Sequence, residues 1–178
     1  FLTHIRNTDA IAHVVRFFVD DDIIHVNGQP NPTSDFDDIN SELILSDIST
    51  LENLTKRVTK SKSSEKEKSS LLEEVNTAIE ILNDNKFLNS NNLKKVKEAF
   101  PDIKMLTQKP MFVIANINED TNKEDIELFK NNLPNNIVLV DMNVKIETDL
   151  NELSDEEKVE FMKEFNISES ALSKIIKT

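Results

Sequence analysis

The chain has 178 residues, of which 38% are hydrophobic and 30% charged, the composition of a globular protein long enough to bury a core. It contains no cysteine, no run of about 18 apolar residues and no charged-then-apolar leader, so a disulfide framework, a membrane span and a secretory signal are all unsupported. The formal net charge of −12 excludes broad nucleic-acid binding over the whole surface, because neutralising phosphates requires clustered Lys and Arg. We expect neither DNA nor a membrane as a partner, and any contact with RNA to be local.

Two features indicate a piece of a longer protein without a phosphate-binding loop. Phe1, rather than Met, begins the chain in the middle of an apolar pattern, FLTHIR. The single glycine, Gly28, rules out the motifs GxxxxGK[ST] and GxGxxG, because both need several positions without a Cβ beside a phosphate. We therefore assign no catalytic residue and no metal ligand within this chain.

The first half of the chain predicts a strand, a loop and a long helix. Ile11–Phe18 is rich in Val, Ile and Phe and predicts a strand, whereas the polar stretch 20–35 has turn residues throughout and predicts a loop. From there apolar residues recur in steps of three and four, with Ser34 and Asp35 available as caps, which is typical of an amphipathic helix. The apolar stripe consists of Phe36, Ile39, Leu43, Ile44, Ile48, Leu51, Leu54 and Val58.

A second stripe follows a polar interruption. The run TKSKSSEKEKSS (59–70) contains no hydrophobic residue, and the apolar rhythm resumes from Leu71 to Leu82. Two amphipathic helices joined by a polar tip predict an antiparallel helical hairpin, in which each helix buries its stripe against the other. At a rise of 1.5 Å per residue the first helix is roughly 35 Å long, so we expect the hairpin to project.

The rest of the chain predicts short strands alternating with helices. Ser154 and Ser168 are expected to cap the last two helices. Strands separated by helices imply a parallel sheet with helical crossovers, so the fold class is α/β, the second half of a doubly wound domain. The predicted elements are helix Leu93–Phe100, strand Met111–Ala115, helix Asn122–Asn131, strand Asn136–Val140, helix 154–165 and helix 168–176.

Polar side chains follow two of the predicted strands, at the edge where open parallel sheets bind ligands. Asn116-Ile117-Asn118-Glu119 comes after the strand at 111–115, and DMNVKIE (141–147) comes after the strand at 136–140. On turn preferences alone, such a polar segment is more often an ordinary turn and helix cap than a ligand clamp. The residues by themselves leave both interpretations open.

Two other groups of polar residues are weaker candidates. Asp20–Asp22 offer carboxylates that suit Mg²⁺ or Ca²⁺, but adjacent side chains point in different directions, which favours a solvated loop. His4, His13 and His25 lack the spacing of metal ligands. We expect His13 to be a core or edge residue of the first strand, and His25 to help position the loop near the sheet.

The two polar segments resemble the fourth and fifth motifs of P-loop nucleotide-binding proteins of the GTPase class, N/TKxD and SAK, which close over the base. Asn116 keeps the amide that reads the base edge, Ile117 keeps the apolar cover without an ammonium, and Glu119 holds its carboxylate one methylene further out than Asp. Moving the carboxylate weakens guanine selection and removes a penalty against adenine, whose N1 is an acceptor where guanine has a donor. The resemblance therefore implies a preference for ATP. Asn143-Val144-Lys145 corresponds to the SAK-like segment, with Asn143 where Ser is common.

Four ordered segments extend the resemblance over most of the chain. They are FLTHIRNTDAIAHVVRFFVDDDIIHVNG, INSELILSDISTLE, KPMFVIANINE and KIETDLNELSDEEKVEFMKEFNISESALSKII. The chain resembles the Obg-like ATPases, the YchF subfamily of the Obg family of P-loop GTPases. This resemblance implies a nucleotide-binding domain in two parts, 1–35 and 96–178, with a helical hairpin (coiled coil) inserted at 36–95. It also implies that the fragment lacks the phosphate loop and the TGS domain of the family.

The resemblance further implies an activity for the longer protein. That protein would be an enzyme, a P-loop hydrolase of ATP, and of GTP less or also, that works with Mg²⁺ and associates with ribosomes. This chain would supply base recognition and the helical arm, and by itself would hold no cofactor and be inactive. We expect a cytoplasmic location, with an organelle left open. The alternative is an adaptor that binds ribosomes or proteins through the helical hairpin without catalysis of its own.

The polar tip carries a local excess of positive charge. Clustered cations at the end of a projecting arm suit phosphate contacts with ribosomal RNA, the partner that the family implies. A solvated, disordered tip explains the same lysines and serines equally well, and the sequence does not decide between the two. This region has two acidic residues, Glu65 and Glu67, and six basic residues, so its local charge is +4. The six basic residues, here named the tip cations, are Lys56, Arg57, Lys60, Lys62, Lys66 and Lys68.

Overall fold

The computed structural model describes residues 2–20, 22–26, 28–164, 167 and 169–177 and divides into two compact units. The helical unit comprises Phe1–Ile11 and Asp37–Pro110, and the sheet unit comprises Ala12–Phe36 and Met111–Thr178. No helix in the described part of the chain is long and apolar enough to cross a bilayer. The domain scheme 1–35, 36–95 and 96–178 stays a prediction about the longer protein.

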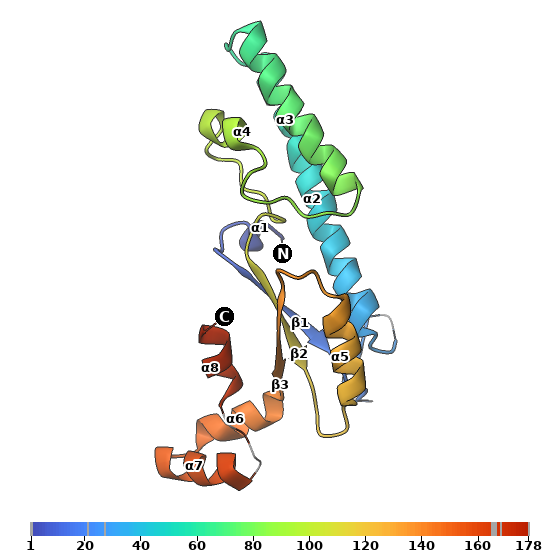
Figure 1. Ribbon diagram of the computed structural model, residues 1–178, viewed down its shortest axis with the longest axis vertical. Coiled ribbons are helices and arrows are strands. Elements are labelled where there is room, and N and C mark those ends of the chain that lie inside the picture. The colour runs from blue at the N-terminus through green and yellow to red at the C-terminus, as the bar shows by residue number, and fades with distance from the viewer. Residues whose placement is uncertain (1, 21, 27, 165–166, 168, 178) are drawn as a thin grey trace. The chain divides into compact units, whose positions relative to one another are not determined.

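The elements alternate as the α/β prediction requires (Figure 1). In chain order they are α1 (Leu2–Ile5), β1 (Ile11–Arg16), α2 (Pro32–Lys60), α3 (Glu65–Asn83), α4 (Lys94–Ala99), β2 (Met111–Asn116), α5 (Lys123–Asn132), β3 (Val138–Met142), α6 (Val144–Glu152), α7 (Asp155–Glu164) and α8 (Ala171–Ile176).

The three strands form one parallel sheet in the order β1-β2-β3. β2 and β3 pair in parallel from Phe112 opposite Val138 to Asn116 opposite Met142. β1 runs in the same direction, because the Ile11 amide donates to the Pro110 carbonyl at 2.9 Å and the Phe17 amide to the Asn116 carbonyl at 2.9 Å, so both chains advance equally between the two bonds. The predicted fold class, α/β with a parallel sheet and helical crossovers, is confirmed.

Several predicted boundaries are displaced by local turn and cap chemistry. β3 begins at Val138 rather than at Asn136, because Pro134 opens a turn that the Ile137 amide closes on the Pro134 carbonyl at 2.9 Å. Asp141 and Met142 therefore belong to the strand rather than to the segment after it. β1 ends at Arg16, two residues before the predicted end.

The predicted loop 20–35 is also shortened, because α2 begins at Pro32. Proline fits the first helical position, since it has no amide hydrogen to leave unsatisfied and its φ is already helical. The cap is Asn31, whose Oδ1 accepts from the Ser34 amide at 3.1 Å, while Asp35 Oδ2 accepts from the Asn31 amide at 3.2 Å. Ser34 is thus not a cap. Asp35 supports the start of the helix by accepting a hydrogen bond from the Asn31 amide.

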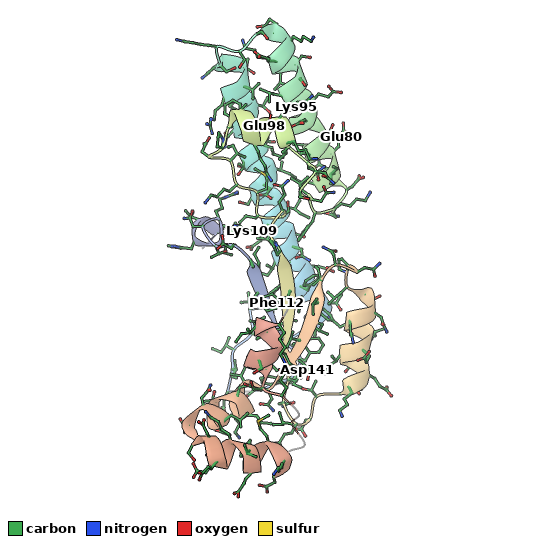
Figure 2. The ribbon with its side chains drawn as sticks, turned by 60° about the vertical axis from the view of Figure 1, so that its left-hand side comes forward. Glu80, Lys95, Glu98, Lys109, Phe112 and Asp141 are labelled. Atoms are coloured by element: carbon green, nitrogen blue, oxygen red, sulfur yellow. The ribbon has the colours of Figure 1, made fainter. Side chains whose placement is uncertain are left out.

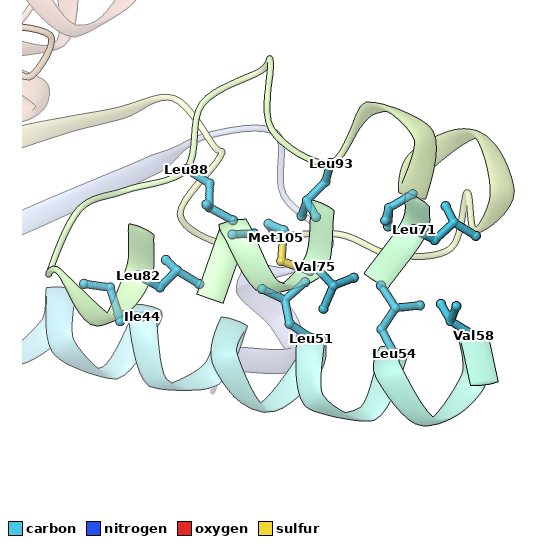
Figure 3. Close-up of a cluster of buried hydrophobic side chains, with 12 residues drawn as sticks. Ile44, Leu51, Leu54, Val58, Leu71, Val75, Leu82, Leu88, Leu93 and Met105 are labelled. Atoms are coloured by element: carbon cyan, nitrogen blue, oxygen red, sulfur yellow. The ribbon is translucent and has the colours of Figure 1, made fainter. Parts of the chain in front are cut away.

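The predicted stripe of α2 packs in two cores. Its members from Ile44 to Val58 join α3, α4 and Met105 in the helical unit (Figure 3), whereas Phe36 joins the core of the sheet unit. The polar run 59–70 is helical except at residues 61–64. α3 starts with a capping box, in which Ser64 Oγ accepts from the Glu67 amide at 3.3 Å and Glu67 Oε2 accepts from the Ser64 amide at 2.8 Å. The pKa of the Glu67 carboxyl is lowered because the Ser64 amide donates to it at 2.8 Å and the Ser64 hydroxyl at 2.9 Å.

One charged side chain lies inside this apolar stripe. Asp47 is fully buried, and its carboxylate accepts from the Leu106 amide at 2.9 Å, the Thr107 amide at 2.8 Å and Thr107 Oγ1 at 2.9 Å. Arg6 adds a fourth donor at 3.3 Å and also donates to the Lys104 carbonyl at 2.6 Å. Asp47 thereby fixes the segment that precedes β2 onto α2.

Aromatic rings build the core of the sheet unit. Phe129 of α5 makes edge contacts with Phe17 and Phe36 at centroid distances of 5.2 and 5.7 Å, and it packs with Val15 and Val113 from the strands. The core therefore joins β1, β2 and α5 with the first turn of α2.

The C-terminal helices confirm one predicted cap and correct another. Ser154 and Glu157 form the expected capping box of α7, with the Ser154 amide donating to Glu157 Oε2 at 2.9 Å and the Glu157 amide to Ser154 Oγ at 3.5 Å. α8 is capped by Ser170, whose Oγ accepts from the Ser173 amide at 3.2 Å. The predicted cap, Ser168, lies outside the described residues. α6 was not among the predicted elements.

Candidate functional site: the carboxyl edge of the sheet

The sheet brings the two predicted base-recognition segments together. Asn116, the last residue of β2, lies opposite Met142, the last residue of β3, and the Ile117 amide donates to the Met142 carbonyl at 3.0 Å. Asn143 follows directly after Met142. Parallel strands end at the same edge of a sheet, so Asn116 and Asn143 both lie at this edge.

In the loop after β2, one polar side chain holds the turn together and others are free to contact a ligand. Asn118 is structural, because its Oδ1 accepts from the Asp120 amide at 3.1 Å and from Thr121 Oγ1 at 2.8 Å, which closes a tight turn. Asn116 is half-buried, and no described residue makes a hydrogen bond with its carboxamide group. Ile117 is also half-buried, and Glu119 is exposed on the turn. The amide of Asn116 and the carboxylate of Glu119 are the groups that this loop presents to a ligand.

The segment after β3 starts α6. The Asn143 Oδ1 caps this helix by accepting from the Ile146 amide at 3.2 Å, so the oxygen is occupied while the amide nitrogen remains a donor. Val144 and Lys145, in the first turn, are exposed. An Asn therefore performs at this position the capping role that Ser performs equally well, which gives a structural reason for its presence here.

Two residues that the sequence analysis missed hold the C-terminal helix near this edge. Glu147 of α6 accepts from the Ala171 amide at 2.6 Å, and Lys174 of α8 lies 3.6 Å from the Asp141 carboxylate of β3. Glu147 was missed because α6 itself was not predicted. Its carboxylate joins α6, which starts at the edge, to the first turn of α8.

The weaker candidates take structural positions. His25 Nε2 lies 3.1 Å from Asp35 Oδ2, near the cap of α2, in agreement with its expected role in positioning the loop. Asp20 accepts from the Asp22 amide at 2.9 Å within the loop. Among the described residues no three His, Cys, Asp or Glu side chains are arranged to hold a metal ion.

The tip cations differ in whether their charge is already paired. Arg57 makes a bidentate pair with Asp102 at 2.8 and 3.1 Å and lies 5.0 Å from the Phe100 ring centroid. Its hydrogen bond with Asp102 raises the pKa of Arg57 and lowers that of Asp102. Lys68 pairs with Glu65 at 3.1 Å and Lys56 contacts Asn53 at 3.5 Å.

The other three tip cations, Lys60, Lys62 and Lys66, are exposed and make no ion pair with any described residue. The positive charge of the tip is therefore available at these three lysines and at Lys56, whose partner Asn53 is neutral.

The amino-acid sequence of the chain is similar to those of several known proteins. No protein-family model matches the chain. It is 42% identical over 122 residues to the ribosome-binding ATPase YchF of Pasteurella multocida, a match that covers 67% of this chain and 34% of that protein. YchF of Bacillus subtilis is 38% identical over 139 residues, covering 67% of this chain and 33% of the relative. YchF of Buchnera aphidicola subsp. Schizaphis graminum is 38% identical over 184 residues, covering all of this chain and 50% of the relative.

The chain thus spans between a third and a half of the length of these curated relatives. Over the part that it spans, the chain belongs to the YchF family.

Proposed function

We propose that this chain is the base-recognition part, with the helical arm, of a longer protein that binds and hydrolyses ATP and associates with ribosomes. One observation carries the base site: the pairing of Asn116 with Met142, which sets the half-buried Asn116 amide beside the start of α6. The relatives carry the activity, since those named above are called ribosome-binding ATPases. The carboxyl edge of a parallel sheet is also where such folds bind nucleotides.

The loop after β2 supports recognition of adenine in particular. The Asn116 carboxamide offers both a donor and an acceptor to the base edge, and no described side chain competes for either. Ile117 supplies an apolar face, while Glu119 is exposed and carries its carboxylate one methylene further out than the Asp of the guanine-binding pattern. An unmet hydrogen-bonding group is what discriminates between two bases of similar size, so adenine is accepted here.

The first turn of α6 completes the proposed site. Asn143 keeps α6 in register through its cap and retains its amide nitrogen for the base, and Val144 with the methylenes of Lys145 covers the base from one side. These roles are those of positioning residues, and we assign no catalytic residue to the chain.

The Mg²⁺ that accompanies ATP is assigned to no residue of this chain. Among the described residues, no three His, Cys, Asp or Glu side chains are grouped to hold a metal ion by themselves. We therefore derive no chemical step through the ion.

A specificity exchange in the full-length protein tests the base site. Ile117→Lys with Glu119→Asp restores the ammonium and the shorter carboxylate of the guanine-binding pattern, so GTP should gain at least about tenfold in affinity relative to ATP. Asn116→Ala should weaken both nucleotides, because it removes the amide that both bases use. Calorimetric titration with ATP and GTP measures both effects.

Asn131→Ala, an exposed change on α5, is the matched control and should leave both affinities unchanged. If Asn116→Ala binds both nucleotides as the unmodified protein does, the base site lies elsewhere.

The alternative function is an adaptor that works through the helical arm. The observation that favours it is that Lys60, Lys62 and Lys66, together with Lys56, are exposed and make no ion pair with a described residue. Reversing the first three with Lys60→Glu, Lys62→Glu and Lys66→Glu should release the full-length protein from ribosomes in sedimentation at moderate salt. If nucleotide-free protein still co-sediments and ATP makes no difference, the adaptor describes the protein better than the hydrolase does.

A further inference from the structure

The helical unit brings a second group of lysines beside the tip cations. Lys94, Lys95 and Lys97 belong to α4, far along the chain from the tip, yet α4 packs against the first half of α3. Lys95 Nζ donates to Ser70 Oγ of α3 at 2.6 Å, and the Lys95 and Val96 amides donate to the Glu74 carboxylate at 3.3 and 3.1 Å. Figure 2 shows Lys95 and Glu98 on α4, within the helical unit.

The C-terminal end of α2 is also joined to α4. The bidentate pair of Arg57 with Asp102 ties the last turns of α2 to the segment just after α4, and Arg57 also covers the Phe100 ring. These contacts make one continuous surface from the end of α2, the start of α3 and α4.

This surface is positive although the chain is negative. Residues 56–74 and 94–104 together carry ten basic and six acidic side chains, a net charge of +4, whereas the whole chain has −12. Of the six acidic residues, Asp102 is paired with Arg57 and Glu65 with Lys68, while Glu74 accepts from two backbone amides of α4. Lys94 and Lys97 are exposed and make no ion pair with any described residue.

Lys94 and Lys95 of α4 are not explained by the stability of their helix. Cations are favourable near a helix C-terminus and unfavourable near its N-terminus, but Lys94 and Lys95 occupy the first turn of α4, which has no acidic residue. The backbone amides of that turn are instead capped by Glu74 from α3. The charge of Lys94 and Lys95 thus costs the helix some stability and offers positive charge to a partner.

The surroundings of these lysines favour RNA over a lipid surface. Peripheral membrane binding combines cations with apolar anchors that enter the bilayer. The exposed large hydrophobic residues of the described chain include Leu45 and Leu128 but none from residue 46 to residue 127. Cations without apolar anchors are what a phosphate backbone requires, because its affinity comes from releasing counterions.

We propose that Lys94, Lys95 and Lys97 of α4 form one phosphate-binding surface with Lys60, Lys62 and Lys66, and that its partner is structured RNA. The proposal rests on the ribosome association proposed above and adds to it the helix α4, together with the chemical class of the contact. Arg57 and Lys68 are not counted, because their charges are paired within the protein.

The test uses the full-length protein with the double change Lys94→Gln and Lys97→Gln, which leaves the hydrogen bond of Lys95 to Ser70 in place. Binding to deproteinised ribosomal RNA is measured over a range of KCl concentrations without nucleotide. Each lost phosphate contact lowers the slope of log affinity against log salt by about 0.7 to 0.9, so the slope should fall by about 1.5. The affinity at low salt should fall at least about tenfold.

Lys123→Gln with Lys163→Gln is the matched control, because it removes the same charge from exposed helical lysines of the sheet unit. This control should keep the original slope, and ATP affinity should be unchanged in both variants. An equal loss of slope in the control variant would mean that only net charge matters, and would overturn the assignment to α4.

Three further outcomes contradict the proposal in different ways. Unchanged binding of ribosomal RNA by the α4 variant, while the tip variant loses ribosome co-sedimentation, removes α4 but leaves the proposed ribosome association intact. Loss of ribosome co-sedimentation with unchanged RNA affinity identifies an acidic protein surface as the partner. Binding to mixed phosphatidylcholine and phosphatidylglycerol vesicles that depends on Lys94 and Lys97, without RNA binding, identifies a membrane.

Discussion

At the scale of single residues, His13 shows how burial sets a protonation state. Its ring stacks on Phe36 at a centroid distance of 5.2 Å inside the sheet unit, and its Nδ1 has no hydrogen-bond partner among the described residues. Burial lowers the pKa of His13 from its ordinary value of 6.5, and the nearby Asp35 carboxylate opposes this by raising it. In the folded protein His13 is therefore neutral at neutral pH.

This lowered pKa predicts a loss of stability in mild acid. Below pH 6.5 His13 binds a proton in the unfolded chain but stays neutral in the folded chain. The contribution of neutral His13 to the free energy of unfolding is therefore complete above pH 6.5 and falls as the pH is lowered from there. One proton changes the free energy of unfolding by at most about 1.4 kcal/mol per pH unit. His13→Phe should keep the ring stacking and remove this part of the pH dependence, as measured by urea unfolding from pH 7.5 to 5.5.

His4→Phe is the control for the histidine prediction, because His4 is exposed in α1. The His4→Phe variant measures how much an exposed change from His to Phe alters the unfolding curves by itself. A His13→Phe variant with the original slope would show that carboxylates alone account for the acid sensitivity.

The contrast between Asp47 and its neighbours shows what can be read from sequence at this scale. Leu43, Leu51, Leu54 and Val58 were predicted to be buried from their spacing, and they are. Asp47 lies four residues from both Leu43 and Leu51, so a carboxylate on the apolar stripe was the available signal of a buried polar contact. Its donors could not be foreseen, because they lie about 40 residues before it in the chain and about 60 after it.

At the scale of elements, α4 depends on its neighbour for its first turn. Leu93 at its start has a left-handed backbone with φ 62° and no side-chain cap, yet its side chain is buried in the helical core. The Glu74 carboxylate of α3 accepts hydrogen bonds from the Lys95 and Val96 amides, which the side chain of a cap residue would normally accept. α4 is therefore stabilised as a helix by packing and capping from α3.

Glu74→Ala should loosen α4 while leaving α3 formed. Losing a cap of this kind costs about 1 kcal/mol, so the amides of Lys95 and Val96 should exchange with solvent several-fold faster. Hydrogen exchange followed by mass spectrometry measures this on the peptides that cover α4. Glu73→Ala, the exposed neighbour, should have no such effect, and equal protection in the two variants would mean that packing alone holds α4.

The strand ends show the limit of prediction for elements. The existence of β2 and β3 followed from their apolar runs, but β3 starts two residues later than predicted because a turn after Pro134 shifts it. The two polar segments lie together because β2 and β3 pair in the register that places Asn116 opposite Met142. A single sequence does not reveal which residues of two strands will pair. The polar segments were therefore predictable as candidates, and their alignment was not.

At the scale of the whole molecule, two hydrophobic clusters form the interior. Val75 lies in the cluster of the helical unit and Val113 in the cluster of the sheet unit, and both are fully buried. No residue belongs to both clusters among those described. We expect each cluster to open with its own free energy.

A matched pair of changes tests this independence. Val75→Ala and Val113→Ala remove the same two methyl groups, and each should cost about 2 kcal/mol in the cluster where it lies. Hydrogen exchange of the variants should show faster exchange in α2 and α3 for the first change, and in β2 and β3 for the second. Equal effects of each change in both units would show that the chain unfolds as one cooperative body.

The division into units also decides the order in which the chain can fold as it is synthesised. The sheet unit is discontinuous, since Ala12–Phe36 is separated from Met111–Thr178 by the main segment of the helical unit. Within this chain β1 pairs with β2, and this pairing cannot form until residues 37–110 have left the ribosome, which takes on the order of 4 to 15 s at roughly 5–20 residues per second. During that interval α2, α3 and α4 can close their own core, so the helical unit can form before β1 meets β2.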